Sequence, residues 1–136
     1  MVRQIVRDPV FLGMKSEPAT AADLWVAEDL LDTLRAHADG CAGMAANMIG
    51  VRKAVIAFFD GGKPRVMLNP RILRRSGEFE AEEGCLSLDG VRRVTRYSVI
   101  KVAWENLQME QCAQRFIGFT AQVIQHEVDH CNGIVI

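Results

Sequence analysis

The last helix predicted from the sequence carries two histidines four residues apart, and very little chain follows it. Helical spacing of apolar residues runs over Phe119–Cys131, and Asn132-Gly133 is a helix-stop signal. Within this helix His126, Glu127 and His130 form the pattern H-E-x-x-H. Histidines at this spacing lie one turn apart on one face, so both imidazoles can reach one metal ion while Glu127 handles the proton of a metal-bound water. The fold must therefore present this face of a buried helix to a further ligand.

A catalytic metal of this kind needs a third protein ligand and an open position for water. Only six residues follow His130, and none of them is His, Asp or Glu. The third ligand is therefore expected upstream. The best candidate is Cys85, because the neighbouring Gly84 allows close backbone approach and a thiolate suits a borderline-soft divalent ion. Cys131 is a weaker candidate, since on a helix it points about 100° away from His130.

The remaining sequence predicts an α+β fold, a mostly antiparallel β-sheet packed around this late helix, with an N-terminal packing helix. The capping box Thr20–Asp23 begins the N-terminal helix, and Gly40 ends it. From Val51 to about Gln114, short apolar runs alternate with turn signals, as in a sheet built from hairpins. The expected strands are Val55–Phe59, Val66–Leu68, Ser98–Trp104 and Arg115–Ile117. The expected turns are Asp60–Gly62, Pro70, Asp89-Gly90 and Glu105-Asn106.

Length and charge narrow the class of protein. The 136 residues contain no repeat or linker, so we expect a single domain over residues 1–136. A net charge of -1 without a basic run argues against nucleic-acid binding. Apolar runs such as Ala54–Phe59 are far shorter than the roughly 20 residues of a membrane span, and the N-terminus is no signal peptide. The 4 cysteines form no Cys-x-x-Cys pair, as expected for free thiols or ligands in the cytoplasm.

Three segments match, in order, the motifs G-x-A-A-x-Q, E-G-C-L-S and Q-H-E-x-D-H. Gly43–Met48 matches the first motif except at its last position, where Met48 replaces Gln. Glu83–Ser87 and Gln125–His130 match the second and third motifs in full. On these motifs, and on the connecting Met67–Pro70 and Ser76–Glu78, the chain resembles the peptide deformylase family over essentially its whole length.

The resemblance implies a hydrolase that removes the N-formyl group from N-formyl-methionyl peptides and releases formate, a step of N-terminal processing in bacterial-type protein biosynthesis. Metal-bound water would attack the formyl carbon, with Glu127 as general base and then general acid. The cofactor would be one divalent ion, Fe²⁺ in the cell, with Zn²⁺, Ni²⁺ or Co²⁺ as alternatives. The implied metal ligands are Cys85, His126 and His130.

Further roles follow from the same resemblance. The backbone N–H of Leu86 would stabilise the oxyanion, and Gly43 and Gly84 would bind the peptide in strand-like fashion. Asp129 and Arg96 would form an ion pair that fixes the helix and orients the ligands. The partner would be a formylated peptide or nascent-chain N-terminus. Longer family members continue past the third motif, so the ribosome docking that such an extension supports is not predicted for a sequence ending at Ile136. The last residues, Ile134–Ile136, are expected to form a short strand or pack against a neighbour.

The first motif departs from the family pattern in a way that bears on turnover. The family's Gln donates a hydrogen bond to the oxyanion, whereas the thioether of Met48 has no hydrogen to donate. Losing such a donor costs about 10²–10³ in rate. The alternative function is therefore a paralogue that keeps metal and fold, with weak or altered amide hydrolysis or a binding or regulatory role. Asn47 and Cys41 also depart from the pattern, and both are expected to change the floor of the substrate cleft.

Gln122 is a second departure, on the ligand face of the helix four residues before His126. The family places an apolar residue of the methionine pocket at this position. Gln122 could restore a polar donor near the site, or reshape the pocket for a side chain other than methionine. The alternative is a glutamine that is hydrogen-bonded to nearby backbone.

Overall fold

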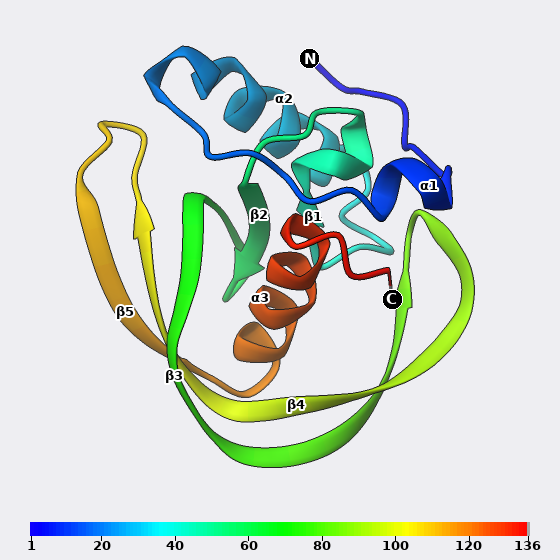
Figure 1. Cartoon of the computed structure of the whole chain (residues 1–136), viewed down its shortest axis with the longest axis vertical. Coiled ribbons are helices and arrows are strands. Elements are labelled where there is room, and N and C mark those ends of the chain that lie inside the picture. The colour runs from blue at the N-terminus through cyan, green and yellow to red at the C-terminus, as the bar shows by residue number, and fades with distance from the viewer. Residues whose placement is uncertain (136) are drawn as a thin grey trace.

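The computed structural model describes residues 1–135 and contains one five-stranded antiparallel sheet with helices packed on it (Figure 1). The strands follow one another in the sheet in chain order, β1-β2-β3-β4-β5. This arrangement confirms the predicted α+β class. The elements are α1 (Pro9–Leu12), the 3₁₀ turn η1 (Ala21–Asp23), α2 (Leu24–Ala36), β1 (Gly43–Ala45), the 3₁₀ turn η2 (Ala46–Ile49), β2 (Val55–Asp60), β3 (Lys63–Cys85), β4 (Leu88–Glu105), β5 (Gln111–Ile117) and α3 (Gly118–Cys131).

The β2 strand explains how the two helices are placed on the sheet. Val55 and Ala57 pack into an apolar cluster with α2, whereas Ile56 and Phe58 pack into a second cluster with α3. Alternate strand residues point to opposite faces, so a strand covered on both faces is apolar at every position. The continuous apolar run in the sequence thus marks the centre of the molecule, with α2 on one side and α3 on the other.

The longest elements, β3 and β4, form a curved hairpin that wraps around α3 (Figure 1). Two predicted turns inside this hairpin are wrong. Pro70 lies within β3, at a shift of register between Leu68 and Arg71 where the strand tolerates a residue without an N–H. Asp89-Gly90 belongs to β4, and the chain reverses at Leu86-Ser87 instead, because Cys85 pairs directly with Leu88.

The other predicted strands and turns fit the sheet. Asp60 pairs with Lys63 across Gly61-Gly62, which confirms the first hairpin. The turn after Glu105 is closed by the Met109 N–H, which donates to the Asn106 carbonyl. Pairing of β4 with β5 brings the second pair of predicted strands together.

In the described part of the chain, no helix is long and apolar enough to cross a membrane.

Both predicted helices are present, with boundaries close to those expected. The Thr20 N–H donates to Asp23 Oδ2 over 2.8 Å, which closes the capping box and leads into α2. The α2 helix ends at Ala36, and a turn continues to Gly40. The short helix α1 was not predicted, although Asp8 caps it and Pro9 occupies its first turn.

The chain leaves α3 through Asn132 and Gly133, as the stop signal predicted. Gly133 has a φ of 72°, which is in the left-handed region, and its N–H donates to the carbonyl of His130. After it, Val135 packs against the α2-side cluster, whereas Ile134 is half exposed. Residues 134 and 135 form no strand, so the expected packing holds for Val135 and not for Ile134, and Ile136 lies outside the described residues.

Gly133→Ala should destabilise the fold more than Gly61→Ala, although both glycines have positive φ. A Cβ at Gly133 would lie 2.6 Å from the backbone oxygen of Gly13, whereas a Cβ at Gly61 would meet nothing within 4 Å. We expect Gly61→Ala to lower the free energy of unfolding by about 1 kcal/mol and Gly133→Ala by about 1–3 kcal/mol more. Urea denaturation of both variants measures this, and equal losses would contradict the clash.

Candidate metal centre

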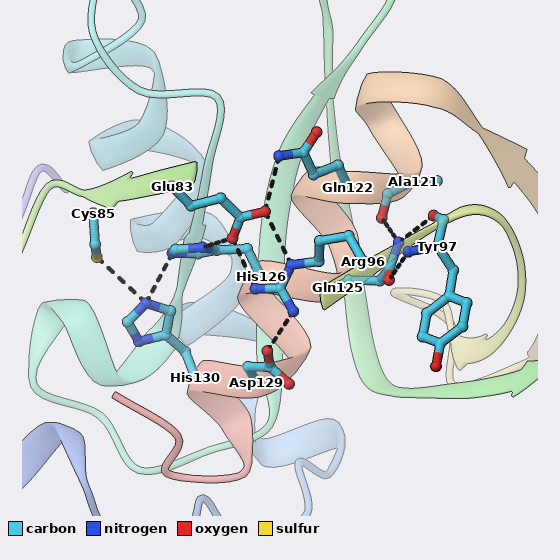
Figure 2. Close-up of polar contacts among 10 residues, drawn as sticks. All are labelled: Glu83, Cys85, Arg96, Tyr97, Ala121, Gln122, Gln125, His126, Asp129 and His130. Carbon is cyan, nitrogen blue, oxygen red and sulfur yellow. Dashed lines mark hydrogen bonds and ion pairs between the residues drawn. The ribbon is translucent and has the colours of Figure 1, made fainter. Parts of the chain in front are cut away.

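Cys85, His126 and His130 meet at one point, although Cys85 and His130 are 45 residues apart in the sequence. Their ligand atoms all lie within 4.8 Å of one another. The His130 Nε2 lies 3.3 Å from Cys85 Sγ and 3.2 Å from His126 Nε2 (Figure 2). Cys85 is the last residue of β3, and the two histidines face it from successive turns of α3. Cys131 is buried on the same helix but does not belong to this group.

The protonation of the two histidines and the kind of atoms around them bear on whether a metal cation fits between these residues. Two neutral Nε2 lone pairs at 3.2 Å would repel each other, so one proton must lie between them when no cation does. Burial lowers the pKa of His126, but the hydrogen bonds that its ring donates to Cys85 and Glu83 outweigh burial and raise it to about 10. Burial and the charge on His126 lower the pKa of His130 to about 4. The two imidazoles therefore differ in protonation, and a donor set of one sulfur and two nitrogens within 4.8 Å of one another fits a divalent ion.

Glu83 orients the first histidine. Its Oε1 lies 2.8 Å from His126 Nδ1, which directs the opposite ring nitrogen, Nε2, towards Cys85 and His130. Buried Arg96 donates to both oxygens of Glu83, from Nε over 2.9 Å and from Nη2 over 2.8 Å. A carboxylate behind a ligating histidine fixes the ring and its tautomer. This contact was not predicted, and the sequence carries one signal for it, the position of Glu83 at the start of the second motif.

Arg96 connects this carboxylate to a second one on α3. Its Nη1 donates to Asp129 Oδ2 over 2.7 Å, so the pair expected from the resemblance is in contact. Burial raises the pKa of Glu83, but hydrogen bonds from His126, Arg96 and Gln122 outweigh burial and hold it at about 2. Glu83 therefore remains ionised and keeps its hydrogen bond to His126.

Glu127 occupies a different environment. Its side chain is 3% exposed, Oε1 has no hydrogen-bond partner in the described structure, and burial raises its pKa to about 7. Gly43 on β1 makes room for it, since a Cβ there would lie 3.1 Å from Glu127 Oε2 and 2.7 Å from a methyl group of Val123. A carboxyl group with this pKa can both accept and return a proton near neutral pH.

A cavity of ≈ 270 Å³ is lined by Cys85, His126 and Glu127, but not by the fully buried His130. The residues predicted to bind substrate or stabilise the oxyanion all line it, and Cys41 lines it too. Asn47 does not. It is fully buried in η2, and its Nδ2 donates to the His130 carbonyl over 3.0 Å, so the expectation that it changes the cleft floor is wrong. Successive residues of a 3₁₀ turn point about 120° apart, which separates Asn47 from the cavity-lining Met48. The predicted residues that line the cavity are Gly43, Met48, Gly84, Leu86 and Gln122.

The side chains of Met48 and Cys41 offer no free donor to the cavity. Met48 is 1% exposed, and its sulfur accepts a hydrogen bond from the Ala45 N–H over 3.5 Å. The Cys41 thiol donates to the Gly43 carbonyl over 2.9 Å. Burial and the nearby Glu127 raise the pKa of Cys41 to about 11, so the thiol keeps its proton.

Gln122 is bonded to a side chain and not to nearby backbone. Its Nε2 donates to Glu83 Oε2 over 2.9 Å, which contradicts the backbone-bonded alternative (Figure 2). Gln125, in contrast, uses both ends of its amide on the backbone of Tyr97 and so fastens α3 to β4. The two glutamines are three residues apart, and only Gln122 lines the cavity.

Comparison with known proteins agrees with this geometry. The family model for polypeptide deformylase matches residues 2–136. A peptide deformylase of Clostridium beijerinckii is 49% identical over 136 residues, which cover 100% of both chains. A peptide deformylase of Pseudothermotoga lettingae is 39% identical, with 99% of this chain and 81% of that protein covered.

Solved structures show the same fold. A class I type b peptide deformylase from Acinetobacter baumannii with bound Met-Ala-Ser superimposes with a TM-score of 0.88 and 30% identity, covering 99% of this chain and 97% of the other. The peptide deformylase of Thermotoga maritima gives a TM-score of 0.88 and 31% identity, with 99% and 95% coverage. The chain therefore belongs to the peptide deformylase family, as a divergent member in which Met48 stands at the last position of the first motif.

Proposed function

We propose that the protein removes the N-formyl group from N-formyl-methionyl peptides and releases formate. The observation that carries the proposal is the cluster of Cys85, His126 and His130, of which Cys85 and His126 line one cavity together with Glu127. Family membership supports the reaction class, and a related structure holds Met-Ala-Ser, a peptide with an N-terminal methionine. The residues and the family thus favour the same chemistry.

Cys85, His126 and His130 would hold one divalent ion, with Fe²⁺ as the proposed ion in the cell and Zn²⁺, Ni²⁺ or Co²⁺ as alternatives. When bound, such an ion lowers the pKa of a coordinated water and polarises a carbonyl oxygen. A reduced Cys85 is needed as a ligand, and all four cysteines are free. We therefore place the protein in the cytoplasm, where thiols stay reduced. We also propose a single domain over residues 1–136.

Glu127 would move the proton that the reaction requires. Its carboxylate takes a proton from water as the water oxygen bonds to the formyl carbon, and then gives that proton to the leaving nitrogen. The C–N bond breaks, and the products are formate and a peptide with a free amine. The raised pKa supports this role, because Glu127 must hold the proton between the two steps.

Backbone groups around the cavity would position the peptide. Leu86 lies between β3 and β4, outside both strands, so its N–H is available to an oxyanion. In the described sheet β1 is one of the two edge strands, and an extended peptide can pair with such an edge. Gly43 on β1 and Gly84 on β3 line the cavity on either side and offer backbone groups without side chains.

Met48 favours a second candidate function, a paralogue that keeps metal and fold but hydrolyses amides weakly or serves in binding or regulation. Met48 lines the cavity, and its sulfur accepts a hydrogen bond from the Ala45 N–H. The side chain of Met48 therefore has no hydrogen to donate to an oxyanion. A structural metal module is disfavoured, because a buried Glu127 without a hydrogen-bond partner at Oε1 would only destabilise such a module.

Glu127→Gln should keep the metal and lose turnover. The substitution preserves shape and removes the proton acceptor, so we expect formate release from a formyl-Met-Ala-Ser peptide to fall about 10²–10⁴-fold. Bound metal is quantified in the same preparation, with Cys85→Ser as the variant that loses it and the exposed Glu28→Gln as the control that changes neither. Turnover that survives in Glu127→Gln would rule out Glu127 as the base.

Met48→Gln should increase turnover, because it places an amide donor on the cavity wall. We expect formate release to rise by about 10²-fold, the usual contribution of one oxyanion donor. Met48→Leu is the matched control, since it removes the thioether without adding a donor and should give no increase. A metal-bearing protein that is inactive until Met48 is replaced by Gln would identify the paralogue. Equal rates for the Gln and Leu variants would show that position 48 does not face the oxyanion.

A further inference from the structure

The amide of Gln122 is a polar group in the wall of the cavity beside the candidate metal ligands. Gln122 lies on α3 one turn before His126, is half buried, and lines the cavity next to the apolar side chains of Phe119 and Val123. The same cavity reaches Cys85 and Glu127. A substrate whose formyl group lies at the ligands would therefore place its first side chain within reach of Gln122.

The orientation of this amide is fixed by its partner. A carboxylate only accepts hydrogen bonds, so the end of Gln122 that lies 2.9 Å from Glu83 Oε2 must be the NH₂ group. The carbonyl oxygen, Oε1, then points away from Glu83 (Figure 2). Within residues 1–135 no group donates to Oε1, and the second N–H of the amide also has no partner.

Glu83 does not need Gln122 as a partner. Its two oxygens already accept one hydrogen bond from His126 and two from Arg96, all between 2.8 and 2.9 Å. An apolar side chain at position 122 would leave these three bonds intact. Gln122 instead brings an acceptor and a spare donor into a half-buried wall, where they are costly to desolvate unless a bound molecule pairs with them.

We propose that Gln122 determines specificity for the first residue of the substrate, an inference that rests on the proposed deformylation. Its Oε1 and spare N–H pair with an uncharged side chain that carries both a donor and an acceptor, such as the carboxamide of glutamine. Acidic side chains are disfavoured by the nearby carboxyl groups of Glu83 and Glu127. The cavity then accepts N-formyl peptides that begin with a carboxamide residue as well as those that begin with methionine.

Three formyl tripeptides of matched length test this specificity. They begin with norleucine, methionine or glutamine and continue with Ala-Ser, and kcat/KM is measured by formate release. Gln122→Leu and Gln122→Met remove the amide, and Gln108→Leu, at an exposed turn residue, is the control. We expect the wild-type ratio of glutamine to norleucine peptide to fall roughly 10–10²-fold in both Gln122 variants and to stay unchanged in Gln108→Leu.

An equal loss of turnover with all three peptides would overturn the proposal and assign Gln122 a purely supporting role behind Glu83. Thermal unfolding checks that the variants are folded, and the more conservative Gln122→Met covers the case in which the leucine variant is not. If the wild-type protein releases no formate, the proposed deformylation fails, and calorimetric Kd values for the same three peptides are compared. A change in the glutamine-to-norleucine ratio of Kd would support Gln122 as a specificity residue, and an unchanged ratio would overturn it.

Discussion

The buried ion pair between Glu83 and Arg96 is the interaction on which the rest of the site depends. Glu83 lies near the end of β3, Arg96 lies in β4, and through Asp129 and His126 the pair reaches two turns of α3. Taking these charges out of water is expensive, and bidentate charge-assisted hydrogen bonds offset the cost only while every partner is in place. The hairpin and the helix are therefore held in one relative position, and the metal ligands they carry are held with them.

Two carboxyl groups beside the same ligands have opposite properties for the same reason. Glu83 receives hydrogen bonds at both oxygens and remains ionised, whereas Glu127 is buried without a partner at Oε1, and its pKa rises to about 7. Environments that separate the pKa values of neighbouring groups divide their roles. A permanently charged group can orient an imidazole, and a group that titrates near neutrality can transfer protons. The two glutamates could not exchange these tasks without moving Arg96.

Local patterns in the sequence predict much of this arrangement, and contacts across the β3–β4 hairpin explain what they miss. The helical spacing of His126 and His130 is local, and the short motif Glu83–Ser87 is the signal for Cys85. The contact of Glu83 with His126 depends instead on how far a curved hairpin reaches around α3, and no spacing along the chain encodes that distance. Asn47 is a similar case, since its bond to the His130 carbonyl joins residues 83 positions apart.

Met48 and Gln122, two of the departures from the family pattern, change the polarity of the cavity wall in opposite ways. Met48 leaves the cavity without a side-chain donor at its position, and Gln122 brings an amide into the same cavity. The hydrogen bond to Glu83 fixes this amide in one orientation, with its carbonyl oxygen and its second N–H free of partners in the described residues. Under the proposed specificity, the amide of Gln122 would therefore pair with the side chain of the substrate at this part of the cavity wall. In the proposed reaction, the backbone N–H of Leu86 and the metal ion would stabilise the oxyanion.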